Sequence, residues 1–322
     1  MPEASQTRAY LALLAIMVLW GSYPAMAKLA FRDFPPLFLT TLRCVVASVF
    51  LVGLLLRSGE ATTRGLTPAA VRVFLILGFC GLFLSMQLTY IAIYYTTAAN
   101  VVILSAATPV LVAVVARVYL GERLARVQWA GVAASAFGVV LIITNGRLAA
   151  LRVEELRAGD FINLVSIGGW TAYTVYGKRV LGTFSPALAT TGAYVMGTLL
   201  LIPTTVVTAP FFPPPRLASA FAWAVVLYQA LLGAVAHVWW YRAVEIVGPS
   251  RSAIFMNLQP VVGIALAATL LSEPITRWQL IGGTFVLAGV ALTTVRHGGP
   301  SHGPPNPPHA RSAPGNPRHS SK

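Results

Sequence analysis

The sequence is poor in charge. Only 10% of its 322 residues are charged, whereas 57% are hydrophobic. A soluble domain carries about 25% charged residues, so this composition argues against a water-soluble fold. Apolar runs long enough to cross a bilayer as a helix, about 20 residues each, recur along the chain. We therefore predict an integral membrane protein whose first partner is the lipid bilayer.

Cysteine is also scarce. Cys44 and Cys80 both lie inside apolar runs, and neither has a CxxC partner. This pattern indicates neither a disulfide framework nor a metal site. We also find no Ser/His/Asp arrangement, no metal-ligand spacing and no glycine-rich phosphate loop. The expectation is a protein that is not an enzyme, with no catalytic residue, no cofactor and no bound metal.

Acidic residues number nine against 23 basic ones, which gives a net charge of +14. The basic residues flank apolar runs or lie in the C-terminal tail, so we expect no nucleic-acid partner. The nine carboxylates map to tails, loops or span ends, which leaves proton coupling through a buried acid unsupported. The mid-span positions likewise lack the buried arginines or lysines that a polyanionic solute would need.

Two stretches of the chain repeat one pattern, from a tyrosine through a proline to a glutamate. At an offset of 151, the matched residues are Tyr90 and Tyr241, Pro109 and Pro260, Glu122 and Glu273, Gln128 and Gln279, Gly131 and Gly282, and Gly138 and Gly289. At an offset of 150, they are Trp20 and Trp170, Tyr23 and Tyr173, Lys28 and Lys178, and Pro36 and Pro186. The chain therefore consists of two copies of one unit.

The apolar runs predict ten helices, because a segment in lipid must satisfy its own backbone hydrogen bonds. The expected spans are 10–30, 36–56, 71–92, 97–119, 125–145, 160–180, 187–208, 221–243, 248–271 and 278–296. The expected units are an N-terminal segment 1–9, a first repeat 10–145, a loop 146–159, a second repeat 160–296 and a disordered basic tail 297–322.

The basic residues also predict the orientation. Most of them fall on the cytoplasmic side if both termini are cytoplasmic, which agrees with the positive-inside rule. Each copy has an odd number of expected spans, so the two copies cross the membrane in opposite senses. Inverted repeats of this kind are typical of transporters that bind their substrate near the midplane.

A resemblance to a known family rests on several of these residues. They are Trp20-Gly21-Ser22, Lys28, Pro36, Arg43, the stretch from Pro109 to Gly121-Glu122, and its copy ending at Ser272-Glu273. Over residues 10–296 the chain resembles the EamA family of the drug/metabolite transporter superfamily. The resemblance implies ten helices around a central cavity, and a bacterial inner-membrane exporter of amino acids or related metabolites. Arg43 departs from the repeat, because Gly192-Ala193 stand at its position in the second copy.

Polar and aromatic side chains inside the spans are the candidates for substrate binding, because polar groups are costly in lipid. The candidates are Gln87, Tyr90, Asn100, Trp170, Tyr173, Gln229, His237 and Trp240. Such a neutral aromatic cavity suits zwitterions with apolar side chains. His237 is the only mid-span group that titrates near neutrality, so proton antiport through it is a minor alternative to facilitated export. Helix packing and interfacial belts are the competing interpretation of these side chains.

Two lysine–glutamate pairs are candidate gates. The predicted topology places Lys28 and Glu273 at outer helix ends, and Lys178 and Glu122 at inner ends. We expect symmetry-related ion pairs that close alternately, although exposed ion pairs contribute little to stability. Pro109 and Pro260 fall in the middle of their spans, and each predicts either a hinge or a static kink.

The predicted function is the export of amino acids or similar small metabolites by alternating access, by a monomeric transporter. Export of aromatic or cationic drugs stays open as an alternative. A non-transporting membrane scaffold or a channel is the alternative from a different class.

Overall fold

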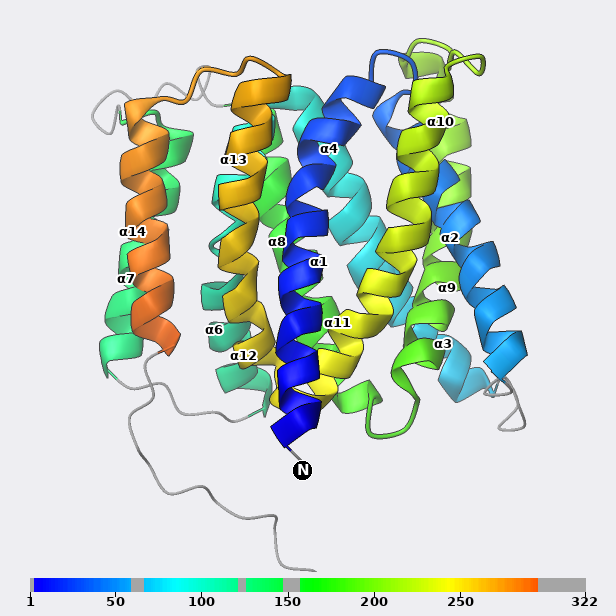
Figure 1. Ribbon diagram of the computed structural model, residues 1–322, viewed down its shortest axis with the longest axis horizontal. Helices are drawn as coiled ribbons and strands as arrows, with labels where there is room; N and C mark the ends of the chain where they lie inside the picture. The colour runs from blue at the N-terminus through cyan, green and yellow to red at the C-terminus, as the bar shows by residue number, and fades with distance from the viewer. Residues whose placement is uncertain (1–2, 59–66, 121–125, 147–156, 295–322) are drawn as a thin grey trace, which may run out of the picture.

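Helices form all the regular structure that the computed structural model describes, in residues 3–58, 67–120, 126–146 and 157–294. They stand side by side along one direction (Figure 1). In the first half they are α1 (Glu3–Ala30), α2 (Pro36–Ser58), α3 (Pro68–Gly78), α4 (Leu88–Tyr95), α5 (Ala98–Ser105), α6 (Thr108–Leu120) and α7 (Arg126–Ile143). In the second half they are α8 (Ala158–Val180), α9 (Pro186–Thr208), α10 (Ala220–Leu227), α11 (Gly233–Val247), α12 (Pro249–Ile254), α13 (Gln259–Leu270) and α14 (Arg277–Thr294).

Six helical segments are long and apolar enough to cross a membrane. They are Ser5–Ala30, Pro36–Ser58, Pro68–Tyr95, Ala98–Tyr119, Pro186–Phe211 and Ala220–Val247, and each matches an expected span. The other four expected spans are also helical, as α7, α8, α12 with α13, and α14, but they are shorter, more polar or interrupted. The chain is thus a multi-pass helical protein, and the count of ten spans stays a prediction.

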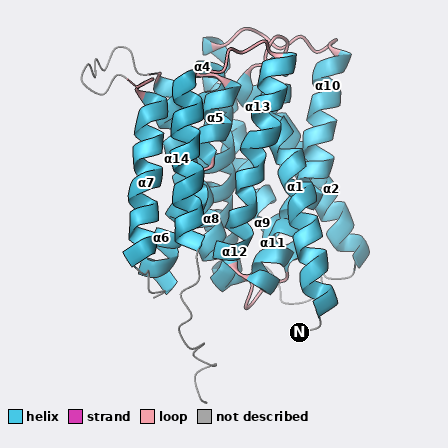
Figure 2. Cartoon of the chain, turned by 60° about the vertical axis from the view of Figure 1, so that its left-hand side comes forward, coloured by secondary structure: helices cyan, strands magenta, loops and turns pink. Residues whose placement is uncertain are grey.

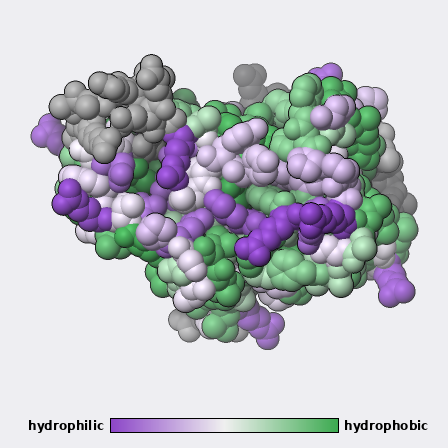
Figure 3. Space-filling view, turned by 90° about the horizontal axis from the view of Figure 1, so that it is seen from above, coloured by the Kyte–Doolittle hydropathy of each residue, from purple (hydrophilic) through white to green (hydrophobic). Residues whose placement is uncertain are grey.

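The sides of the bundle carry large apolar side chains in the open. Val49, Val118, Val206, Val207 and Phe211 are among the most exposed. Figure 3 views the bundle from the end at which α1 terminates. Hydrophilic residues form a band across this end, and hydrophobic residues surround the band. Exposed apolar side chains over the sides of a soluble monomer would promote aggregation. In a membrane protein, lipid covers them.

The first helices of the two halves run in opposite directions. Lys28, at the end of α1, donates to the backbone carbonyl of Thr96, and the Thr96 hydroxyl donates to Asp160 at the start of α8. The end of one helix therefore meets the beginning of the other. The N-terminal end of α1 and the C-terminal end of α14 lie at the same face of the bundle (Figure 1). This arrangement is consistent with two repeats of opposite orientation.

The third expected span of each half contains a π-helical stretch near its middle. Phe79–Gln87 joins α3 to α4, and Tyr228–Leu232 joins α10 to α11. The wider turn rotates the second part of each helix relative to the first, and such turns are frequent at functional sites. After the wide turns, α4 packs mainly against α8, and α11 packs mainly against α1.

Pro109 and Pro260 do not lie in the middle of a continuous helix, and this expectation was wrong. Each proline is the second residue of a new helix, α6 or α13. Where α5 ends, the backbone N–H groups of Ala106 and Ala107 donate to the carbonyl oxygens three residues earlier, those of Ile103 and Leu104. Proline fits the first turn of a helix, where its missing N–H costs no hydrogen bond. The fourth and ninth expected spans are thus discontinuous, as in many transporters.

Helices α7 and α14 pack closely along their length at one side of the bundle, in both views (Figures 1 and 2). A Cβ atom added to Gly138 would clash with the carbonyl oxygen of Gly282, and one added to Gly289 would clash with that of Gly131. These are the four glycines matched by the repeat. Small residues permit such close approach of helices in lipid, so equivalent positions of the two repeats meet each other here.

Candidate functional site

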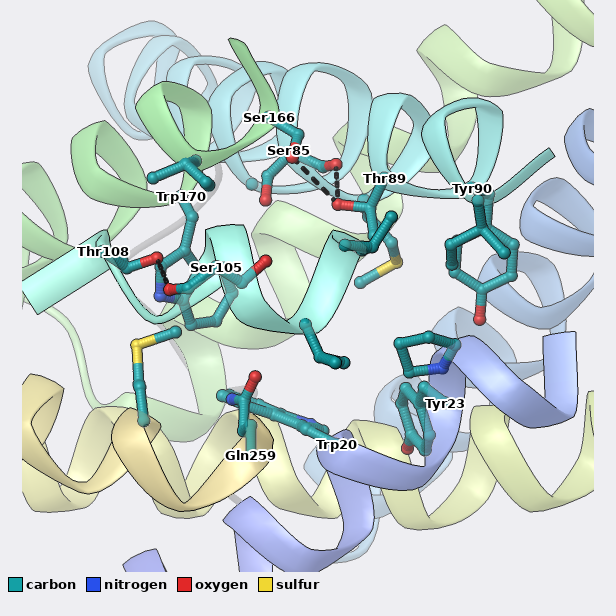
Figure 4. Close-up of a pocket in the computed structure, with 18 of the residues that line it drawn as sticks. Trp20, Tyr23, Ser85, Thr89, Tyr90, Ser105, Thr108, Ser166, Trp170 and Gln259 are labelled. Carbon is teal, nitrogen blue, oxygen red and sulfur yellow. Dashed lines mark hydrogen bonds between the residues drawn. The ribbon is translucent and has the colours of Figure 1, made fainter. Parts of the chain in front are cut away.

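A cavity of about 130 Å³ lies between the two halves. Its walls come from α1, α2, α4, α5 and α6 of the first half and from α8, α11 and α13 of the second, together with the π-helical stretch before α4 (Figure 4). An engineered protein cavity of about 150 Å³ holds a benzene-sized molecule. The cavity therefore has room for a small solute, and it lies where inverted repeats place the substrate.

One end of the cavity is aromatic. The rings of Trp20 and Trp170 meet edge to face with their centroids 5.1 Å apart, and Trp20 lies 5.0 Å from the ring of His237. Trp240 packs behind Trp170 at 5.5 Å and is fully buried. The indole Nε1 atoms of all three tryptophans are buried without a hydrogen-bond partner. Indole N–H groups usually find a partner when buried, so this wall presents donors that the described protein atoms leave unused.

Tyr23 and Tyr90 form the other end, on the side of the cavity away from Trp170 (Figure 4). The Tyr90 hydroxyl donates to the Oε1 atom of Gln229. The Nε2 atom of Gln229 lies 3.4 Å from the backbone oxygen of Tyr23. Gln229 therefore holds both tyrosines in place from behind, and it does not itself line the cavity.

Arg43 in α2 lines the cavity beside these tyrosines and is only 3% exposed. Its guanidinium carbon lies 4.8 Å from the ring centroid of Tyr90 and 5.5 Å from that of Tyr23. Its Nε atom has no hydrogen-bond partner, and no described carboxylate forms an ion pair with it. Burying an ion costs several kcal/mol, whereas a cation–π contact returns about 0.5–2 kcal/mol. The prediction that the interior lacks a buried cation is thus wrong at Arg43.

The small hydroxyl groups of the wall are largely satisfied by the protein. Thr89 donates to the backbone oxygen of Ser85 and lies 3.1 Å from the hydroxyl oxygen of Ser166. Thr108 donates to the backbone oxygen of Ser105 at 2.6 Å. These bonds, drawn in Figure 4, support the interpretation of small polar residues as contacts between and within helices.

His237 has a defined arrangement of its imidazole protons. Its Nδ1 atom lies 2.8 Å from the backbone oxygen of Gly233 and 3.1 Å from the hydroxyl oxygen of Tyr194. A carbonyl oxygen only accepts, so Nδ1 must be the donor. The neutral ring then carries no proton on Nε2. Among the described residues, no group of three His, Cys, Asp or Glu side chains could hold a metal ion.

The eight predicted binding residues fall into four places. Tyr90, Trp170 and His237 line the cavity. Gln229, Trp240 and Tyr173 stand directly behind that lining, where Tyr173 stacks on Tyr241 at 4.8 Å. Gln87 donates to the hydroxyl of Thr204 on α9, and Asn100 lies near the outer end of the bundle.

The wall residues that were not predicted to bind the substrate include Trp20, Tyr23, Arg43 and Gln259. The repeat offered a signal for two of them, because Trp20 and Tyr23 are the counterparts of Trp170 and Tyr173. Arg43 carried a second signal as a charge inside an apolar run.

At the predicted outer end, Lys28 and Glu273 form an ion pair with 3.3 Å between Nζ and Oε1. The same carboxylate accepts from the backbone N–H groups of Ala98 and Ala99, each at 3.1 Å. These N–H groups open α5, where the helix dipole favours a negative charge. Glu273 thus joins α1, α5 and the segment after α13.

Asp160 adds a second set of contacts at this end. The carboxylate is buried, at 1% exposure, and accepts from the Thr96 hydroxyl at 2.7 Å and from the Asn100 amide at 3.1 Å. The Asn100 oxygen in turn accepts from Gln279 at 2.6 Å. Asn100 therefore belongs to the outer network. From sequence, Asp160 is only an acid at a span end; its burial follows from the meeting of α8 with α5.

At the opposite end, Lys178 donates to the backbone oxygens of Val244 and Glu245, at 3.2 and 3.1 Å. This repeats the bond from Lys28 to Thr96, because both lysines bind carbonyls at the end of the third span of a repeat. The predicted partner of Lys178, Glu122, lies outside the described residues, as does the predicted tail 297–322.

Known proteins share this architecture. The profile of the EamA-like transporter family matches residues 7–144 and 157–295. The uncharacterized transporter YyaM of Bacillus subtilis is 27% identical over 285 residues, which cover 87% of this chain and 92% of the relative. An uncharacterized transporter of Archaeoglobus fulgidus is 30% identical over 294 residues, covering 90% and 98%.

Two further likenesses concern the membrane and the fold. The uncharacterized inner membrane transporter YedA of Escherichia coli (strain K12) is 22% identical over 290 residues, covering 88% of this chain and 90% of the relative. One crystal structure superposes with a TM-score of 0.63 at 19% identity, covering 90% of this chain and 98% of the other, which shows a shared fold. Since the family profile spans both halves and the relatives align over most of their lengths, the chain belongs to the EamA-like transporter family and is a multi-pass membrane transporter.

Proposed function

We propose that this transporter exports amino acids or similar small metabolites across the bacterial inner membrane, with both termini in the cytoplasm. The observation that carries the proposal is the cavity between two oppositely directed halves. Its aromatic wall suits the apolar side chain of an amino acid, and its polar groups suit the amino and carboxylate groups.

Transport proceeds by alternating access of this cavity to the two sides of the membrane. The contacts of Lys28, Glu273 and Asp160 close the outer end, and Lys178 has the corresponding place at the inner end. The breaks before Pro109 and Pro260 let the two parts of each discontinuous helix move separately. The solute then reaches one side only after the contacts on that side have opened.

The cavity chemistry favours an amino acid over a cationic drug. None of its lining residues is a carboxylate, and Arg43 would repel a second cation placed beside it. A channel would need both ends open at once, which the outer network opposes. A scaffold would have no use for a cavity walled by donors without partners.

Uptake into proteoliposomes tests the proposal. The purified full-length protein is offered a panel of amino acids, an aromatic cationic drug and a sugar phosphate. We expect saturable uptake of one or more amino acids, lowered about tenfold or more by Trp170→Ala, because an anchoring aromatic surface is lost. The matched control is Trp239→Ala on the same bundle, since Trp239 is 43% exposed and does not line the cavity.

The alternatives give different results. Saturable uptake of the drug alone would support the multidrug alternative. Flux that rises linearly with concentration would indicate a channel, and the absence of flux for every solute would contradict transport of this panel.

A further inference from the structure

The cavity wall combines several hydrogen-bond donors that have no acceptor. The Nε atom of Arg43 and the indole Nε1 atoms of Trp20 and Trp170 are all buried without a partner, and all three residues line the same cavity. Buried donors in native proteins are nearly always satisfied. A set of donors without acceptors is complementary to a ligand rich in acceptor oxygens.

Four carboxylate side chains that the structure describes are engaged with other groups or placed elsewhere. Asp33 binds Arg216 and Ser219, Asp160 binds Thr96 and Asn100, and Glu273 binds Lys28. Glu245 is exposed near the opposite end of α11 from Gly233. None of these four carboxylates pairs with Arg43, and no described carboxylate lines the cavity.

We propose that Arg43 binds the carboxylate of the transported solute, with the apolar part of the solute directed toward Trp20 and Trp170. This inference rests on the proposed transport function and specifies its substrate class. Arginine suits the task, because its planar guanidinium can donate two parallel hydrogen bonds to one carboxylate. The guanidinium carbon lies 5.5 Å from the ring centroid of Tyr23 and 4.8 Å from that of Tyr90, and these cation–π contacts supply no counter-charge.

The second repeat explains why one carboxylate, and not a polyanion, is recognised. Gly192-Ala193 stand at the position of Arg43, and a Cβ atom on Gly192 would already clash with the ring of Phe74. Helix α9 therefore packs too closely against α3 to hold a second cation there. The cavity contains a single fixed positive charge among its lining residues, which matches a monocarboxylate or a zwitterion.

Matched acids and amides test this assignment. Phenylacetate and phenylacetamide, L-phenylalanine and its amide, and L-leucine and its amide are each offered to the purified wild-type protein. Binding is read as thermal stabilisation in detergent, and transport as proteoliposome uptake. We expect the acid of at least one pair to be preferred by about tenfold or more, since a charge-assisted bidentate bond is replaced in the amide.

Variants then locate the preference. Arg43→Gln should abolish the discrimination between acid and amide, and Arg43→Lys should keep part of it. The matched control is Arg179→Gln, because the Arg179 guanidinium lies 4.9 Å from the ring of Tyr119 in a similar contact outside the cavity. The readout is a ratio measured on one protein sample, so a lower folded fraction does not alter it. If Arg43→Gln fails to fold, the wild-type ratio and Arg43→Lys still decide.

The outcomes separate this inference from the transport proposal. Preference for acids in binding without any uptake would uphold Arg43 as the carboxylate site and contradict transport. Saturable uptake with no preference for the acid, or a preference that survives in Arg43→Gln, would overturn the assignment while transport stands. No binding and no uptake of any acid would overturn both.

Discussion

The Nζ atom of Lys28 lies 3.3 Å from the Oε1 atom of Glu273, and this contact joins the first repeat to the second. Lys28 ends α1, whereas Glu273 follows α13 and binds the first N–H groups of α5. An exposed ion pair contributes about 0–1 kcal/mol. This pair is partly buried, and Glu273 also accepts from the start of α5. Moving Glu273 away therefore breaks the ion pair and these backbone hydrogen bonds together.

Charge reversal tests the outer gate. We expect Lys28→Glu or Glu273→Lys alone to lower transport on the order of tenfold, because like charges then face each other. The double variant should recover only part of the rate, since a lysine at position 273 cannot accept from Ala98 and Ala99. Uptake assays compare the transport rates of the wild type, the two single variants and the double variant. No recovery at all in the double variant would count against the pairing.

A surface ion pair is the control for charge reversal. The Arg216 guanidinium lies 3.7 Å from the Asp33 carboxylate, and its side chain is 78% exposed. Reversing that pair should leave the transport rate near the wild-type value.

The glycine contact between α7 and α14 predicts a stability effect. Gly138→Ala should destabilise the protein by about 1–3 kcal/mol, because the new methyl group overpacks against the backbone of α14. Gly53→Ala is the matched control, since a Cβ atom there meets nothing within 4 Å. That change should be neutral or slightly stabilising in a helix. Thermal unfolding in detergent measures both, and equal shifts would refute the contact.

The helix breaks predict a kinetic effect. Pro109→Ala and Pro260→Ala should slow transport with little change in apparent affinity, because alanine removes the steric conflict with the preceding turn that keeps the two helical segments from joining into one helix. Pro203→Ala is the control, since Pro203 lies exposed inside α9. Unchanged rates in both test variants would show that the breaks are static.

His237 predicts a negative result. Its Nδ1 atom already donates to the Gly233 carbonyl, and its described ring contacts are aromatic rather than acidic. We expect His237→Gln to keep the wild-type pH profile of transport, whatever its rate. A profile that flattens in this variant would instead support proton antiport through the imidazole.

The sequence predicts the coarse fold because its signals are local. Long apolar runs and the two matched sets of residues, such as Trp20 with Trp170, follow from the chain alone. The helix breaks before Pro109 and Pro260 could not be placed, because a proline fits either a kink or a first turn. The π-helical stretches carry no sequence signal that we recognise.

The site was predicted less well, because burial depends on which helices meet. Tyr90, Trp170 and His237 were proposed as polar or aromatic groups within spans, and they line the cavity. Arg43 was seen only as a charge inside a span. From sequence, Asp160 is only an acid at the end of a span. Its burial becomes visible once α8 is packed against α5, where Thr96 and Asn100 donate to it.

The central claim is that one solute site is exposed alternately to the two sides of the membrane. Counterflow measures this most directly: labelled L-leucine or L-phenylalanine is added to proteoliposomes that are preloaded with the same unlabelled amino acid. The account predicts that preloading accelerates and transiently concentrates the label, and that Trp170→Ala abolishes the effect while Trp239→Ala preserves it. Label that enters linearly with concentration and ignores preloading, or that does not enter at all, would contradict the account.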